Sequence, residues 1–117
     1  MEFRIHREGM ENIAELTGDY LQIRSVEDAV DLLGNASYSG ASKVILHAVQ
    51  LDPAFFALRT GLAGEILQKF SNYHMKLAIV GDYKHSESKS LRDFMYESNR
   101  LGHILFVESL AEALERI

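Results

Sequence analysis

Polar side chains follow two apolar segments, KVILHA at 43–48 and KLAIVG at 76–81, that are typical of buried strands. In parallel α/β sheets, ligands bind in crevices at the carboxyl ends of the strands, so we expect His47, near the end of the first segment, and the residues after both segments along one edge. They supply an imidazole, carboxylates, cations and hydroxyls, a set suited to a small anionic ligand. The candidate ligand-binding residues are His47, Asp52, Arg59, Asp82, Ser88, Lys89 and Ser90. The alternative interpretation is a solvated loop with a serine at a helix cap, since no glycine-rich phosphate-binding motif accompanies the set.

Thr60 precedes Gly61-Leu62 at the expected start of a helix. Backbone N–H groups and the helix dipole attract anions at such a position, and Arg59 would pair with a phosphate there. Thr60 is therefore a candidate regulatory phosphorylation site. The alternative is that Thr60 only caps the helix, because threonine is a common N-cap residue.

A third candidate surface lies on the helix expected from Ser88 to Leu101, whose apolar stripe is Leu91, Phe94, Met95 and Leu101. The opposite side of this helix carries Arg92, Tyr96 and Arg100. Arginine and tyrosine are enriched at protein–protein hot spots, so this side is a candidate interaction face. A solvated charged face is the alternative.

Composition narrows the classes of function. The 117-residue chain has no cysteine, which excludes disulfides and zinc–thiolate sites, and its histidines lack metal-ligand spacing. We expect no metal and no cofactor. The net charge of −5 argues against a nucleic-acid partner, and the short apolar runs argue against a membrane span. With no leader pattern visible, we expect a cytoplasmic protein, and with no catalytic motif, not an enzyme.

The elements that must position these residues alternate along the chain. Strands are expected at 2–7, 12–16, 43–48, 76–81 and 104–107, with the first two forming an antiparallel pair. A helix capped by Ser25 should end at Gly34-Asn35 or at Gly40, with Val26, Ala29, Val30 and Leu33 inward. Others follow at 60–70, at 88–101 and from Ser109. The helix at 60–70 should bury Leu62, Ala63, Ile66, Leu67 and Phe70.

This order, β-β-α-β-α-β-α-β-α, predicts an α/β fold. It has a mixed, mostly parallel sheet carrying helices. Because no linker or repeat interrupts it, residues 1–117 are expected to form a single domain.

Several blocks resemble DUF4180, a bacterial family without an assigned activity. The matching blocks are VEDAVDLLGN at 26–35, FALRTGLAGEILQKFSNY at 56–73, KLAIVGD at 76–82 and SKSLRDFMYESN at 88–99. With the closing strand and helix, the resemblance covers nearly the whole chain. It implies the fold of that family and no particular chemistry.

A looser resemblance is to STAS domains, the module of anti-sigma factor antagonists, which share the element order. Their helix after the third strand opens with Ser-Gly-Leu, where the serine is phosphorylated, and Thr60-Gly61-Leu62 stands in the like position. This chain has Leu58-Arg59 where that family usually has an acid before the acceptor. The resemblance implies a non-enzymatic regulatory module that binds a protein partner. The alternative is a small anionic-ligand binder or small enzyme at the strand-end crevice. A homo-oligomer is compatible with each of these functions and required by none.

Overall fold

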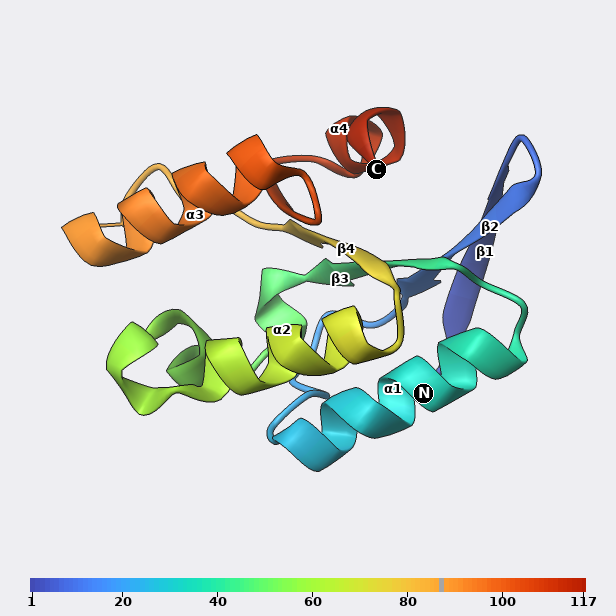
Figure 1. Cartoon of the computed structure of the whole chain (residues 1–117), viewed down its shortest axis with the longest axis horizontal. Coiled ribbons are helices and arrows are strands. Elements are labelled where there is room, and N and C mark those ends of the chain that lie inside the picture. The colour runs from blue at the N-terminus through green and yellow to red at the C-terminus, as the bar shows by residue number, and fades with distance from the viewer. Residues whose placement is uncertain (87) are drawn as a thin grey trace.

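A five-stranded sheet, in the order β1-β2-β3-β4-β5, organises the computed structural model, which describes residues 1–86 and 88–117 (Figure 1). β1 (Phe3–Glu8) runs antiparallel to β2 (Glu11–Leu16). The sheet continues parallel to β2 through β3 (Lys43–His47), β4 (Lys76–Val80) and β5 (Ile104–Val107). The predicted fold class, an α/β domain with a mixed and mostly parallel sheet, is confirmed.

Helices connect the parallel strands. They are α1 (Val26–Tyr38), α2 (Leu62–Asn72), α3 (Lys89–Leu101) and α4 (Leu110–Arg116). Three short 3-10 turns fill the connection from β3 to α2: η1 (Ala48–Gln50), η2 (Pro53–Phe56) and η3 (Leu58–Thr60). None of the described helices is long and apolar enough to cross a membrane.

Serine caps define where three of these helices begin. The Ser25 hydroxyl accepts a hydrogen bond from Asp28 N (3.2 Å), and Ser109 does the same for Glu112 N (3.0 Å). Ser88 caps α3 by accepting from Leu91 N. Each cap satisfies a backbone N–H that has no partner within its helix. The serine signals in the sequence therefore identified these starts correctly.

Two helix boundaries differ from the simplest expectation. α1 continues through Gly34 and Asn35, and of the two expected stops Gly40 is the right one, since it adopts the left-handed φ of +85°. α2 begins at Leu62 rather than Thr60, because Gly61 has a φ of +78° and separates η3 from the helix. An interior glycine such as Gly34 costs only about 1 kcal/mol relative to alanine, so it does not end a helix by itself.

The buried helix faces agree with the predicted stripes except at a few positions. In α2, Ala63, Ile66 and Phe70 are buried, and Leu62 and Leu67 pack partly against the same core. In α1 the buried set is Ala29, Leu32, Leu33 and Ala36, so Leu32 and Ala36 were missed. Leu101 was wrongly placed in the core: it lies in the last turn of α3, about 120° around the helix from the buried Met95, and is 64% exposed.

The two faces of the sheet are covered unequally. α1 and α2 lie below the sheet in Figure 1, and with Leu91 and Met95 of α3 they bury the larger hydrophobic cluster. The other face holds a smaller cluster under α4, formed by β-strand residues and Ala113. α4 packs mainly on β4 and β5, and its cluster reaches only Ile13 of β2 and Ile45 of β3, so in the described chain the uncovered part of this face lies beyond these two residues. That uncovered part carries the site described next.

Candidate functional site

The site begins with a carboxylate on the uncovered part of the sheet. Glu15 follows Ile13 by two residues in β2, so its side chain points to the same face as Ile13, which belongs to the cluster under α4. Its side chain is only 8% exposed. A buried carboxylate requires hydrogen-bond or ion-pair partners, because transferring an unpaired carboxylate out of water carries a large free-energy penalty.

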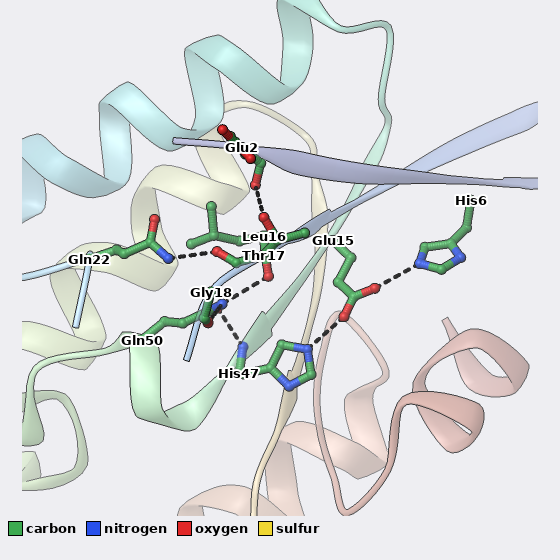
Figure 2. A network of polar contacts seen from close by, with 9 residues as sticks. All are labelled: Glu2, His6, Glu15, Leu16, Thr17, Gly18, Gln22, His47 and Gln50. Carbon is green, nitrogen blue, oxygen red and sulfur yellow. Dashed lines mark hydrogen bonds and ion pairs between the residues drawn. The ribbon is translucent and has the colours of Figure 1, made fainter. Parts of the chain in front are cut away.

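Two histidines from neighbouring strands provide those partners (Figure 2). His6 Nε2 of β1 lies 2.9 Å from Glu15 Oε1, and His47 Nε2 at the end of β3 lies 2.7 Å from Glu15 Oε2. Each carboxylate oxygen thus has its own imidazole. We call these three residues the ionic cluster.

The ionic cluster fixes where the histidine protons are. An ionised carboxylate only accepts hydrogen bonds, so Nε2 of His6 and of His47 must each carry a hydrogen. Burial raises the pKa of the Glu15 carboxyl, but the hydrogen bonds and charges of His47 and His6 outweigh it and hold that pKa below 4.5. The carboxylate is therefore ionised at neutral pH.

His47 borders a hollow of about 270 Å³ at the carboxyl ends of β2 and β3. The hollow is lined by Arg4, Glu15, Leu16, Thr17, Gly18, Asp19, His47 and Val49. The side chain of His47 is 30% exposed, and its Nδ1 points away from Glu15 (Figure 2). Within the described part of the chain, this nitrogen has no hydrogen-bond partner. A neutral His47 would therefore present an unoccupied proton acceptor beside the hollow.

Gln50 holds the strand ends that form the hollow. Its side chain is fully buried, with Nε2 donating to Leu16 O (2.8 Å) and Gly18 O (2.7 Å). Its Oε1 accepts from the backbone N–H of His47 (2.8 Å). One amide thus ties the end of β2 to the end of β3 and fixes the backbone on which His47 stands (Figure 2).

A second set of bonds fixes the loop after β2. Gln22 Nε2 donates to Thr17 O (2.7 Å), and the backbone N–H groups of Gln22 and Ile23 donate to Gln50 O. The Thr17 hydroxyl donates to Glu2 O (3.2 Å). The loop that lines the hollow is therefore held by hydrogen bonds to Gln22 and to Glu2.

The predicted ligand-binding residues do not meet in one crevice. His47 lines the hollow just described, whereas Asp82 lines a different one of about 320 Å³ that includes Phe56, His85 and Ser86. Asp52 caps η2 by accepting from Ala54 N (2.8 Å).

The other members of the predicted set have local roles. Lys89 pairs with Asp93 (2.8 Å), Ser88 caps α3, and Arg59 and Ser90 are exposed. Residues that follow different parallel strands reach the same edge of the sheet, but each side chain can point to either face. These groups therefore do not meet.

The predicted switch and interaction residues are all at the surface. The Thr60 hydroxyl lies 2.7 Å from Ala54 O and accepts from Leu62 N (3.2 Å), so it is bonded within its own turn. On α3, Arg92 donates to Ser86 O, Arg100 pairs with Glu97, and Tyr96 is 73% exposed.

Sequence reasoning missed Glu15, His6 and Gln50. A signal for Glu15 was present, because it stands between Ala14 and Leu16 and two residues after the inward Ile13. His6 shares the face of Arg4 in the first strand. The cluster depends on strand register, in which His6 opposes Ile13 and Glu15 opposes Ile45. Spacing alone does not reveal that register. In the described part of the chain, no group of three or more histidine, aspartate or glutamate side chains has a geometry able to hold a metal ion.

Comparison with known proteins gives one match. A family model described as a domain of unknown function, DUF4180, matches residues 8–117, a range that contains Glu15, His47 and Gln50 but begins after Arg4 and His6. No curated protein matches the chain, and no solved structure does. Because the match spans nearly the full length, this chain belongs to the DUF4180 family.

Proposed function

We propose that this domain binds a small anionic molecule in the hollow at the ends of β2 and β3, with His47 as the group that exchanges a proton with it. The observation that carries the proposal is the pair of His47 Nε2 and Glu15 Oε2, 2.7 Å apart, in a ring whose Nδ1 bonds to none of the described residues. A carboxylate that accepts one imidazole N–H orients the ring and leaves the other nitrogen as a base. This arrangement supports acid–base chemistry at the hollow.

Arg4 favours an anionic ligand. Its Cα lies opposite Glu15 in the β1–β2 ladder, and it lines the hollow. Among the described residues it has no ion-pair partner. Glu15 is already bonded to two histidines, so Arg4 is left to contact a carboxylate or phosphate of the ligand. Asp19 lines the same hollow, so the anionic group would lie toward Arg4 and away from Asp19.

A thermal-shift screen of small carboxylates and phosphates tests the proposal. A ligand that binds only the folded state raises the melting temperature by mass action. We expect at least one compound to stabilise the wild-type chain and to lose that effect in Arg4→Gln and His47→Gln. His103→Gln is the matched control, because His103 is exposed and has no side-chain hydrogen bond in the described chain. Equal stabilisation of all four proteins, or none of the wild type, would contradict the proposal.

The second candidate is a regulatory module that binds a protein partner, as the STAS resemblance implies. The observation in its favour is that Thr60 and Arg59 are both exposed at the entry to α2. A phosphate on Thr60 would remove the hydrogen that its hydroxyl donates to Ala54 O, and would therefore loosen the η2–η3 turn.

Mass spectrometry of the Thr60 peptide from native cells discriminates the two candidates. A phosphorylated peptide, together with a partner that the Thr60→Glu variant loses, supports the regulatory module. An unmodified peptide favours the ligand-binding function. Either function is proposed for the cytoplasm, and cell fractionation tests that location.

A further inference from the structure

The two edges of the sheet differ in how their backbone groups are satisfied. At the β5 edge, the side chain of Asn99 accepts from Phe106 N (2.6 Å) and donates to Phe106 O (3.0 Å). An amide side chain thus occupies the place where another strand would pair. At the β1 edge, the described residues contribute no such bond. Exposed strand edges are the surfaces to which further strands add.

The hairpin ladder shows which groups of β1 face outward. Thr17 N donates to Glu2 O, so Glu2 and Thr17 form a hydrogen-bonded pair. Such pairs alternate in an antiparallel ladder, so Arg4, His6 and Glu8 bond inward to β2. The backbone N–H and C=O groups of Phe3, Ile5 and Arg7 therefore point away from the sheet.

Two opposite charges on this edge strand lack partners. Arg4 and Glu8 share one face of β1, and neither forms an ion pair within the described chain. Glu8 faces Glu11 across the hairpin, and Glu11 is already paired with Lys43 at 2.7 Å. Four residues of extended strand separate Arg4 from Glu8 by about 13 Å, too far for them to pair with each other.

We propose that β1 pairs antiparallel with β1 of a second copy of this chain, centred on His6. In that register Arg4 of each copy lies opposite Glu8 of the other, which forms two equivalent ion pairs. Ile5 lies opposite Arg7 of the second copy, and both present their outward backbone groups for the new ladder.

The charges select this register over its neighbours. A shift of two residues in one direction places Arg4 opposite His6, and a shift in the other places Arg7 opposite Arg7. Both shifts lose the two ion pairs. Like charges directly opposite across a ladder are destabilising, whereas opposite charges stabilise it. The product is a two-fold dimer with a continuous ten-stranded sheet, counting five strands from each copy.

The hairpin is placed to allow this pairing. In Figure 1 it stands at the far right of the molecule, away from α2 and α3, and β1 packs on β2. Arg4 also lines the ligand hollow, and its five N–H donors suffice for both a ligand and Glu8 of the second copy. Glu8 does not line the hollow, so changes at Glu8 test the dimer without altering the ligand site.

Sedimentation equilibrium of the full chain tests the proposal through a charge exchange. We expect the wild type to dimerise and each single variant, Arg4→Glu or Glu8→Arg, to weaken the dimer by about tenfold or more, since each puts like charges opposite one another twice. The double variant Arg4→Glu/Glu8→Arg should restore the wild-type dissociation constant. Glu115→Arg, an exposed site on α4, is the matched control and should change nothing.

Two outcomes would overturn the proposal. One is a wild type that stays monomeric at every concentration reached. The other is a dimer that the single variants leave unchanged or the double variant fails to restore. Circular dichroism of each variant shows that it is folded. If a variant at position 4 does not fold, Arg7→Pro tests the same interface, because it removes an N–H that points outward and bonds nothing in β2.

Discussion

The two faces of the sheet are built from the same strands but hold different kinds of interior. The face under α1 and α2 is apolar where these helices cover it, with Val44, Leu46, Leu77 and Ile79 fully buried. The opposite face is apolar only beneath α4, and on its uncovered part alternate strand positions carry Glu15, His6 and His47. On this face, α4 excludes water from the apolar part. In the uncovered part, hydrogen bonds from two histidines compensate for the burial of the Glu15 carboxylate. The comparison indicates that stability resides mainly on the first face, whereas the site that we propose lies on the second.

The largest effect is expected on the apolar face. Ile66→Ala removes a side chain that is 1% exposed and leaves a cavity between α2 and the sheet. We expect a loss of about 2–5 kcal/mol in the free energy of unfolding. Leu101→Ala is the control, because Leu101 is exposed, and should cost less than about 0.5 kcal/mol. Chemical denaturation measures both, and similar costs at the two positions would contradict this division of the core.

A smaller but still large effect is expected at Gln50, which joins the strand ends. Gln50→Ala leaves Leu16 O, Gly18 O and His47 N without partners. Water can reach Gly18 O and His47 N, so mainly the buried Leu16 O is left unsatisfied, and we expect a loss of about 1–3 kcal/mol in the free energy of unfolding. Gln68→Ala, at an exposed position on α2, is the matched control and should be nearly silent. A Gln50→Ala variant as stable as the wild type would show that the Gln50 hydrogen bonds between the ends of β2 and β3 are not needed for stability.

Glu15→Gln tests the ionic cluster on the uncovered face. At pH 7 we expect a loss of about 1–3 kcal/mol in the free energy of unfolding, because charge-assisted hydrogen bonds to both histidines are weakened. Glu11→Gln is the control, since Glu11 is exposed and pairs with a single residue, Lys43, so this substitution should cost clearly less.

The same variant predicts a dependence on pH. The pKa of Glu15 in the folded chain lies below 4.5, so the unfolded chain takes up this proton more readily. The stability from Glu15 is therefore complete above pH 4.5 and is lost as the pH falls through the folded-state pKa. Thermal melts across pH 2–7 should show the difference between wild type and Glu15→Gln shrinking at low pH. A difference that grows on acidification would have the wrong sign.

The smallest effect is expected at Thr60, whose hydroxyl bonds within an exposed turn. Thr60→Ser keeps that hydroxyl and should be silent, whereas Thr60→Ala removes its hydrogen bonds to Ala54 O and Ala57 O and should cost about 1 kcal/mol. Denaturant midpoints measure both. A Thr60→Ala cost as large as that of Ile66→Ala would mean that the η2–η3 turn is part of the core.

Local signals in the sequence predicted most of the fold. Serine caps at Ser25 and Ser109 act over three residues, and the apolar stripe of α2 repeats within one helix, so both are visible without tertiary information. Leu101 was wrongly predicted because it repeats the position of the partly buried Phe94 seven residues earlier and so stands at the edge of the stripe, about 120° around the helix from Met95.

The site was only partly predictable, for a physical reason. His47 was identified from its place near a strand end, but its partner Glu15 is 32 residues away and meets it through the β2–β3 register. His6 joins them through the antiparallel hairpin. Registers are set by the packing of whole strands, so single-residue patterns do not reveal which polar side chains face each other.

The most direct test of this account is a carbon-13 NMR titration of the Glu15 carboxyl group. We predict that Glu15 titrates below pH 4.5, and that His6→Gln and His47→Gln each raise its pKa, because fewer hydrogen bonds then oppose the effect of burial. A Glu15 pKa above 4.5 in the wild type, or one that neither variant changes, would contradict the claim that two histidines hold an ionised carboxylate beside the hollow.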